Sequence, residues 1–234
     1  YRLAGTDTHL LSNVSFRLEA GESLAIIGPS AAGKSTLARL LTGVWPPTSG
    51  TVRLDGADIA YGPREDLGTR IGYVPQDVEL FGGSVAENIA RLGEVDSEAV
   101  VKAAKRAQVH ELILGMPQGY ETQVGEGGTN LSPGQRQRIA LARALYGDPK
   151  YLVLDEPNSN LDGAGEAALA QALGELHKEG ITSIVVTHRP SLIAHVDKIL
   201  VMGGGRVQQF GPAAEVMKSM QQMQVVGGGK AAAS

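Results

Sequence analysis

The sequence predicts an α/β protein with a mainly parallel sheet, and three observations support this fold class. Apolar runs of strand length alternate with segments of helical periodicity along most of the 234 residues. A glycine-bounded loop at residues 28–36 separates the first buried strand from the first helix. A mainly helical stretch from residue 78 to residue 145 interrupts the alternation. The chain is therefore expected to form a sheet-based lobe with a helical lobe attached to it.

Strands are expected in the first third of the chain at residues 14–18, 23–27, 51–54 and 71–74. Apolar and polar residues alternate in the first of these, which predicts a half-exposed strand, whereas the second is mostly apolar and is expected to be buried. The leucines between the glycine-bounded loop and Gly43 have helical spacing, and the prolines at positions 46–47 cannot continue a helix. The sequence therefore predicts a strand at residues 23–27, then the glycine-bounded loop, then a helix that ends at Gly43.

The rest of the chain continues with helices and then with alternating strands and helices. Helices are expected at residues 84–91, 97–109, 132–146, 166–178 and 212–222, and a helical or turn segment is expected near residues 110–114. Strands are expected at residues 151–154, 181–187, 198–202 and 206–210. Alternation favours parallel pairing, and the glycines at 203–205 favour a hairpin between the last two strands. The core lobe would comprise residues 1–77 and 146–223, the helical lobe residues 78–145, and residues 224–234 a disordered tail or linker.

Composition and charge exclude several classes of function. The chain has no cysteine, which excludes disulfides, thiolate metal sites and cysteine nucleophiles. Its 21 basic and 25 acidic residues give a formal charge of −4, so no cationic field is available to attract nucleic acid. No apolar run approaches the roughly 20 residues that cross a bilayer. The piece is expected to be soluble, and its start at Tyr1 without an initiator methionine indicates a fragment of a longer polypeptide.

The loop after the first buried strand fits the phosphate-binding pattern G-x-x-x-x-G-K-[ST]. Because it opens a helix, its backbone N–H groups and the helix N-terminus would converge on phosphate oxygens. Lys34 would supply positive charge to the β and γ phosphates, and the Ser35 hydroxyl would hold Mg²⁺. The alternative is a glycine-rich turn with an exposed lysine. The expected nucleotide-binding residues of this loop are Gly28, Pro29, Ser30, Ala31, Ala32, Gly33, Lys34, Ser35 and Thr36.

Two acidic residues, Asp155 and Glu156, end the buried strand that begins at residue 151. In open α/β sheets, ligands bind at the carboxyl ends of the strands, so both side chains would face the phosphates. Asp155 suits the Mg²⁺ shell, and Glu156 would polarise a water for in-line attack on the γ-phosphorus. The alternative is a pair of solvated acids at a strand end.

The segment Leu131-Ser132-Pro133-Gly134-Gln135 precedes the helix predicted at 132–146. Here the chain resembles the ATP-binding cassette (ABC) ATPases, whose signature reads Leu-Ser-Gly-Gly-Gln, and the resemblance spans nearly all of residues 1–223. It implies a phosphate-loop NTPase core with a mainly parallel sheet, N-terminal antiparallel strands and a helical lobe that carries the signature. Proline replaces a glycine and removes one backbone donor. A plain helix cap at this position is the alternative reading.

The resemblance implies functions for further residues. Gln76 matches the Q-loop glutamine, which contacts Mg²⁺ or water in the reaction, and is otherwise a polar turn residue. His188 matches the switch histidine at the γ-phosphate, and is otherwise a structural histidine at a strand end. Asp162 matches the D-loop, in which Asn160 is a departure, and is otherwise a helix cap. Tyr1 lies close to where the family's adenine-stacking aromatic residue sits.

ABC cassettes pair head to tail, so the resemblance implies a second copy of this chain as a partner. Ser132, Gly134, Gln135 and Asp162 of one protomer would close over the ATP bound by the other, and two-fold symmetry would give two identical sites. ATP and Mg²⁺ are the implied substrate and cofactor, and hydrolysis would let the protomers separate.

Within the exporters, several segments look most like type I secretion system ATPase/permeases of the protease-exporting group. These segments are residues 41–47, 73–81, 109–120, 140–148 and 155–162. The likeness implies a transmembrane domain fused upstream, a periplasmic adaptor, an outer-membrane channel, an exported protein substrate and a place at the cytoplasmic face of the inner membrane. The alternatives are an exporter of lipids or drugs, or an ABC ATPase acting on chromosomes or ribosomes. A small-molecule kinase with only the phosphate loop would leave residues 131–135 unexplained.

Overall fold

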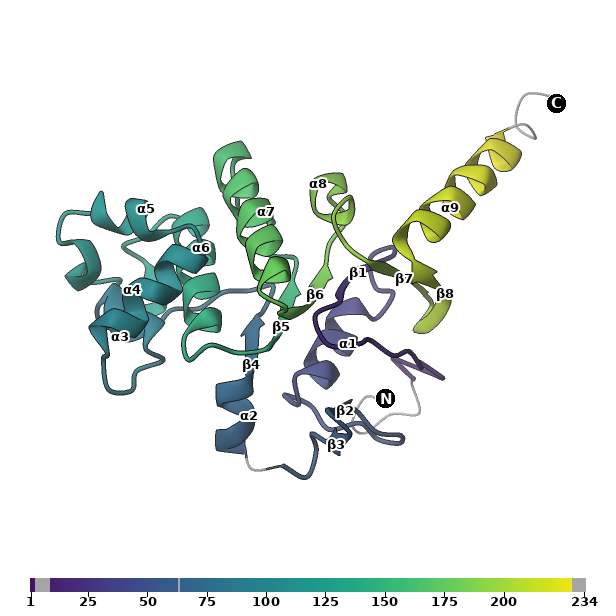
Figure 1. Ribbon diagram of the computed structural model, residues 1–234, viewed down its shortest axis with the longest axis horizontal. Coiled ribbons are helices and arrows are strands. Elements are labelled where there is room, and N and C mark those ends of the chain that lie inside the picture. The colour runs from purple at the N-terminus through teal and green to yellow at the C-terminus, as the bar shows by residue number, and fades with distance from the viewer. Residues whose placement is uncertain (3–8, 63, 229–234) are drawn as a thin grey trace.

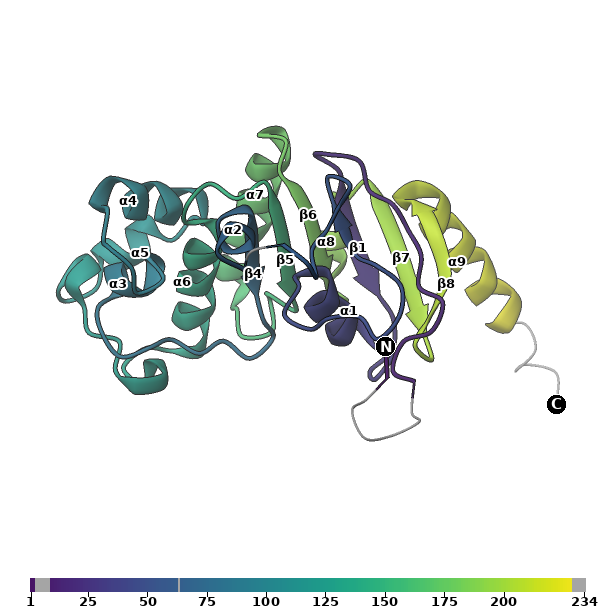
Figure 2. The same cartoon turned by 90° about the horizontal axis from the view of Figure 1, so that it is seen from below.

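The centre of the protein is a six-stranded sheet between two layers of helices (Figures 1 and 2). The computed structural model describes residues 1–2, 9–62 and 64–228. Within them the strand order is β4-β5-β6-β1-β7-β8, with every neighbouring pair parallel except β7 and β8. The strands are β1 (Ser23–Ile27), β4 (Ile71–Val74), β5 (Tyr151–Asp155), β6 (Thr182–Val186), β7 (Lys198–Gly203) and β8 (Arg206–Pro212). The predicted fold class, α/β with a mainly parallel sheet, is confirmed.

Helices cover both faces of this sheet. Helices α1 (Lys34–Leu41) and α2 (Arg64–Arg70) lie on one side, and α7 (Gly163–Lys178), α8 (Pro190–Ile193) and α9 (Ala213–Gly228) lie on the other (Figures 1 and 2). This arrangement explains why β1 and β5 are mostly apolar and are buried along their whole length, since both of their faces are covered. No helix in the part of the chain described here is long and apolar enough to cross a membrane.

Four helices gather at the β4 end of the sheet (Figure 1). They are α3 (Val85–Ile89), α4 (Ser97–Arg106), α5 (His110–Leu114) and α6 (Pro133–Leu145), and the short 3₁₀ turns η1 (Gly119–Glu121) and η2 (Glu126–Gly128) lie between α5 and α6. The helix starts are encoded locally, because Ser84 and Glu87 form a capping box and Asp96 caps α4 with its side chain.

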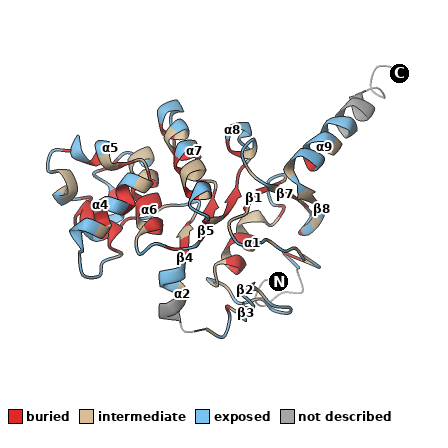
Figure 3. Ribbon diagram, viewed as in Figure 1, coloured by how far each residue is buried: buried red, intermediate tan, exposed pale blue. Residues whose placement is uncertain are grey.

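The helical segment and the sheet share one hydrophobic core (Figure 3). Ile89, Ile139 and Leu145 from α3 and α6 belong to the same buried cluster as Leu152 and Leu154 of β5. Each fully buried side chain of this size contributes about 1.5–3 kcal/mol relative to an exposed one. The position of α6 is therefore tied by packing to the strand that ends in Asp155.

Arg91 adds a polar connection between α3 and the C-terminal end of α6. Its guanidinium donates to the backbone oxygens of Arg143 (3.1 Å), Ala144 (3.2 Å) and Tyr146 (3.0 Å), and also to that of Gly68. The last carbonyls of a helix lack intrahelical partners and carry a partial negative charge, so a cation is favourable there. Burial lowers the pKa of Arg91 below its usual value.

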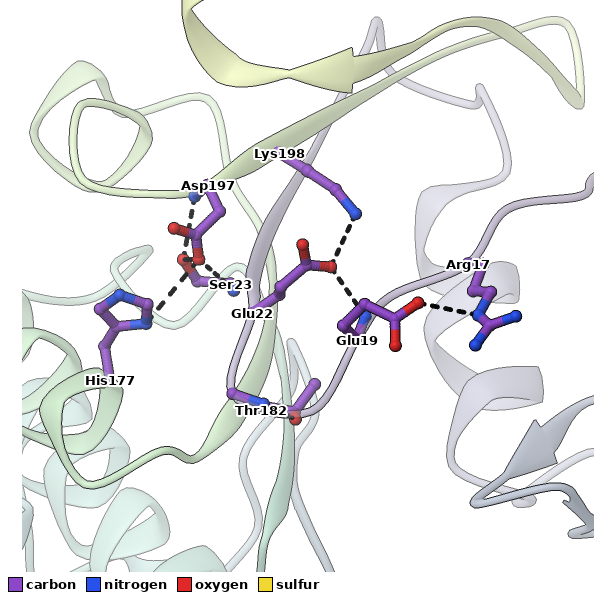
Figure 4. Close-up of polar contacts among 9 residues, drawn as sticks. Arg17, Glu19, Glu22, Ser23, His177, Thr182, Asp197 and Lys198 are labelled. Carbon is purple, nitrogen blue, oxygen red and sulfur yellow. Dashed lines mark hydrogen bonds and ion pairs between the residues drawn. The ribbon is translucent and has the colours of Figure 1, made fainter.

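A second polar cluster joins the amino ends of β1 and β7 (Figure 4). The backbone N–H and the hydroxyl of Ser23 both donate to Asp197 Oδ2 at 2.7 Å, and Lys198 Nζ lies 2.7 Å from Glu22 Oε2. His177 Nδ1 is 3.8 Å from the Asp197 carboxylate. Burial raises the pKa of Asp197, but the hydrogen bonds from Ser23 outweigh it and hold the pKa below its usual value. These contacts fix β7 beside β1 at the amino ends of the two strands, opposite to the end of β1 that leads into the phosphate loop.

The fold differs from the sequence predictions in its short or marginal elements. The strand predicted at residues 14–18 is absent, although Val14, Phe16 and Leu18 are half-buried against the core. The alternation of apolar and polar residues indicates which side chains are buried, whereas a strand also needs a hydrogen-bonded neighbouring strand. Among the described residues, the N-terminal antiparallel pairing consists of β2 (Arg53–Leu54) with β3 (Ala57–Asp58) and one bridge between Arg2 and His9.

Three differences concern elements that sequence patterns place poorly. Helices α2 and α8 were not expected, because they have few residues and no clear apolar period. Helix α9 runs to Gly228, so residues 224–228 are helical rather than a disordered tail. The rest of that predicted tail, residues 229–234, lies outside the described residues. The predicted hairpin is confirmed, with Gly204 and Gly205 at positive φ between β7 and β8.

Candidate functional site

The sequence-predicted phosphate loop, acidic pair, glutamine and histidine lie at the carboxyl ends of four neighbouring parallel strands. Gly28 follows β1, Gln76 lies two residues after β4, and His188 lies two residues after β6. Asp155 is the last residue of β5, and Glu156 follows it. Since β4, β5, β6 and β1 are adjacent in that order, the topology brings these segments to one edge of the sheet. This edge is where open α/β sheets bind ligands.

The phosphate loop has backbone geometry that glycine makes possible. Gly33 has φ +93° and is the N-cap of α1, with no side chain hydrogen-bonded to the helix start. The N–H groups of the first turn of α1 are therefore not capped by a side chain and face the loop interior, where an anion would be stabilised. Lys34 Nζ donates to the carbonyls of Gly28 and Pro29, both at 2.9 Å, so its charge is held across the loop.

We expect Gly28→Ala to disturb this loop. A Cβ at Gly28 would lie 2.3 Å from the backbone oxygen of Met202 in the neighbouring strand, and the residue has φ +151°. Overpacking of this kind costs about 1–3 kcal/mol. Thermal unfolding should show the loss, and nucleotide titration should show weaker binding. Gly174→Ala is the matched control, because no atom lies within 4 Å of its added Cβ and it is in helix α7. Equal effects of the two changes would contradict the role of Gly28.

Asp155 is a buried carboxylate without a hydrogen-bond partner of good geometry among the described residues. The residue is 1% exposed, and among the described residues no donor, the nearby Ser35 hydroxyl included, meets the geometry of a hydrogen bond to either carboxylate oxygen. Burial raises its pKa, the Ser35 hydroxyl partly offsets this, and the charge of Glu156 raises it further. A buried carboxylate costs free energy unless it is paired. Oxygen ligands from a carboxylate and a hydroxyl suit Mg²⁺, so these residues fit that ion.

Glu156 turns away from the strand and meets His188. Its backbone has φ +49°, a left-handed conformation that costs a residue with a side chain about 1–2 kcal/mol, and its N–H donates to Val186 O at 2.9 Å. Glu156 Oε2 lies 3.6 Å from Nδ1 of His188. The side chains are 22% and 66% exposed, so both can reach a ligand at this edge. Strained backbone at such a position is typical of functional sites.

Tyr1 is paired with an aromatic residue that the sequence analysis did not single out. Its ring stacks on Trp45, with centroids 5.4 Å apart and planes 15° from parallel. The guanidinium of Arg39, on α1, lies 4.7 Å from the centre of the Trp45 ring. The expected adenine-stacking residue is therefore half of an aromatic pair beside the phosphate-loop helix. Trp45 is the one tryptophan of the sequence, which was the available signal.

The signature and D-loop residues begin two helices. Ser132 and Gln135 form a capping box at the start of α6, with Gln135 N–H donating to Ser132 Oγ at 3.2 Å. Asp162 Oδ1 accepts from Gly165 N–H at 2.8 Å at the start of α7. A Cβ at Gly134 would lie 2.9 Å from Asn160 O, so the two motifs touch closely. The helix-cap interpretation holds for the chain by itself, and the exposed Ser132 and Asp162 are also available to a partner.

Comparison with known proteins fits this geometry. The protein family described as ABC transporter matches residues 11–159. The chain belongs to the ABC transporter family. It is 54% identical over 209 residues to the type I secretion system ATP-binding protein PrsD of Rhizobium meliloti (strain 1021), covering 89% of this chain and 36% of that protein. An ATP-dependent lipid A-core flippase of Saccharophagus degradans is 42% identical over 206 residues, covering 88% of this chain and 35% of that protein.

Solved structures agree with the ABC assignment. A bacterial Atm1-family ABC exporter with ATP bound matches with a TM-score of 0.84 and 38% sequence identity, covering 92% of this chain and 38% of that one. The chain thus spans about a third of the length of these relatives.

Proposed function

We propose that this ABC cassette hydrolyses ATP and thereby powers a membrane exporter that secretes proteins by the type I route. The observation that carries the ATPase proposal is the meeting of the Lys34 loop, Asp155, Glu156 and His188 at the carboxyl edge of four parallel strands. A cationic loop, an unpaired buried carboxylate and an acid beside an imidazole together supply phosphate binding, a Mg²⁺ ligand and a general base.

In the proposed reaction each residue acts on a stated group. The N–H groups of the loop and Lys34 Nζ bind the β and γ phosphates, and the aromatic ring of Tyr1 stacks on the adenine. Ser35, Asp155 and Gln76 would hold Mg²⁺, whose chemistry is to offset phosphate charge when bound. Glu156 accepts a proton from the attacking water.

His188 completes the site next to Glu156. Its Nδ1 faces Glu156 Oε2 at 3.6 Å, and its exposed ring can donate to a γ-phosphate oxygen through Nε2. The developing charge on the γ-phosphoryl group is thereby met by Lys34 from one side and by His188 from another. Positioning and charge stabilisation of this kind account for most of the rate in phosphoryl transfer.

We further propose that two copies pair head to tail, so that Ser132, Gly134 and Gln135 of one protomer close over the ATP of the other, with Asp162 beside them. The exposed helix start at Ser132 offers a hydroxyl and backbone donors to an anion. Pro133 lacks an N–H, so Ser132 and Gly134 supply the contacts. ATP that touches both protomers favours the paired state by its differential affinity, and hydrolysis removes that preference.

Protein export is the transport proposal that the identities favour. The identity to PrsD is 54%, whereas that to the lipid A-core flippase is 42% over a similar length. In the proposed setting a transmembrane domain is fused upstream, the cassette lies at the cytoplasmic face of the inner membrane, and a periplasmic adaptor and outer-membrane channel complete the path. Nucleic acid is not a partner in this proposal, given the formal charge of −4.

The transported substrate can be tested with the full-length exporter in lipid vesicles. Its ATPase rate would be measured with the C-terminal segment of a candidate secreted protein and, separately, with lipid A. Stimulation by the peptide at micromolar concentration, with none by lipid A, is expected. Stimulation by lipid A alone would favour the flippase alternative, which the 42% identity makes the second candidate. A scrambled peptide of the same composition is the control for nonspecific effects.

A further inference from the structure

A buried hydrogen bond connects the segment after Glu156 to the segment before His188. The Thr187 hydroxyl donates to Asn158 Oδ1 at 3.1 Å, and both residues are 1% exposed. Asn158 Nδ2 is buried and has no hydrogen-bond partner among the described residues. The bond to Thr187 is therefore the side-chain interaction that orients this amide. A buried polar side chain that is only partly satisfied costs stability and calls for an explanation.

The Thr187 hydroxyl acts both as a hydrogen-bond donor and as a hydrogen-bond acceptor. It donates to Asn158, and it accepts the backbone N–H of Arg189 at 3.1 Å, on the far side of His188. The backbone N–H of Thr187 donates to Ile26 O at 3.2 Å, in the strand that leads into the phosphate loop. The backbone on both sides of His188 is thus fixed by Thr187. The His188 side chain itself is 66% exposed, and its Nδ1 lies 3.6 Å from Glu156 Oε2.

We propose that Asn158 is a positioning residue that acts through Thr187 to hold the turn carrying His188 beside Glu156. The inference rests on the proposed function, in which His188 and Glu156 act on the γ-phosphate and the attacking water. Asn158 lies two residues after Glu156. The same short segment therefore positions both the Glu156 carboxylate and the amide that supports the His188 turn. The side chains of Glu156 and His188 are then kept at a fixed relative position, because they follow β5 and β6, whose carboxyl ends are neighbours.

The chemistry requires a hydrogen-bond acceptor at position 158 and a hydroxyl at position 187. Thr187→Val keeps the shape of the side chain and removes the hydroxyl, whereas Thr187→Ser keeps the hydroxyl. Asn158→Leu keeps a similar volume and removes the acceptor. Replacing both hydrogen-bonding partners by apolar groups of similar shape can be nearly neutral for stability. The Asn158→Leu/Thr187→Val double variant is therefore expected to recover much of the stability that either single variant loses.

The experiment measures turnover, ATP affinity and thermal stability of these variants in the full-length exporter. Asn158→Leu and Thr187→Val should each lower kcat about tenfold, because small misplacements of reacting groups carry such costs, while the Kd for ATP stays within about twofold. Thr187→Ser should keep wild-type kcat. The double variant should recover its thermal stability without recovering its kcat. Recovery of both together would show a purely structural role and overturn the proposal.

Thr182 begins β6, the strand that Thr187 directly follows, and Thr182→Val is the matched control. Thr182 Oγ1 accepts the N–H of Gly21 at 2.8 Å at the amino end of β6, away from the site (Figure 4). This change removes the same chemical group and should lower thermal stability without lowering kcat. If Thr182→Val lowers kcat as much as Thr187→Val does, the effect is a general loss of structure and the proposal is wrong.

A double-mutant cycle that combines Asn158→Leu with His188→Ala tests this proposal separately from the proposed function. If Asn158 acts through His188, Asn158→Leu should have little further effect on kcat once His188 has been removed. A further tenfold loss in that background would show that Asn158 acts independently of His188, and would overturn the inference. Wild-type turnover by His188→Ala itself would instead contradict the role of His188 in the proposed function.

Discussion

Lys34→Ala is expected to abolish measurable nucleotide binding by this ABC cassette. The side chain places a positive charge across the phosphate loop, where it donates to the carbonyls of Gly28 and Pro29. Charge-assisted hydrogen bonds to phosphate are among the strongest in proteins. In the proposed function this ammonium contacts two phosphates, so its removal should weaken ATP binding by about a hundredfold or more. Calorimetric titration of the isolated chain with ATP and Mg²⁺ measures this directly.

The control for this prediction is Lys218→Ala. Lys218 is exposed on α9, so the substitution changes the net charge equally at a surface away from the phosphate loop. ATP affinity should be unchanged in that variant. The unfolding temperature of Lys34→Ala without nucleotide should stay near that of the wild type, because the side chain bonds only to its own loop. Tight ATP binding by Lys34→Ala would show that the loop does not bind phosphates as proposed.

The parts of the fold that were predictable are those with strong periodicity. The central strands and helices α4, α6 and α7 begin and end close to the expected residues, because buried apolar faces leave a period of two or of 3.6 in the sequence. Helix α2 and the segment at residues 14–18 were missed or misassigned for a physical reason. Short elements depend on neighbours far away in the chain, and no local pattern records those neighbours.

The candidate site shows the same division between local and nonlocal information. The phosphate loop, the acidic pair and the signature are contiguous motifs, so their residue types and spacing were readable. Trp45 and Asn158 were not found, because each matters through a partner brought close by folding, Tyr1 in one case and Thr187 in the other. A neutral side chain that positions a reactive one has no sequence signature of its own.

The Glu156→Gln variant is expected to bind ATP but to hydrolyse it about a hundred to ten thousand times more slowly, the range that a positioned general base contributes. The amide is isosteric with the carboxylate, so the left-handed backbone and the hydrogen bond to Val186 O should persist. What disappears is the acceptor for the proton of the attacking water. ATP should then remain between paired protomers, because the step that ends the pairing is blocked.

Two measurements separate slow chemistry from lost binding in this variant. Light scattering after size exclusion should show an ATP-dependent dimer of the isolated chain, and rapid filtration of the full-length exporter should show ATP retained long after dilution. Glu215→Gln, on the exposed first turn of α9, removes the same charge and should behave as the wild type in both. Undiminished hydrolysis by Glu156→Gln would mean that another group takes the proton. Slow hydrolysis without retained ATP would leave the role of Glu156 as the base intact but contradict the head-to-tail pairing, since in the proposal closure by Ser132 of the second copy slows the release of nucleotide bound at the Lys34 loop.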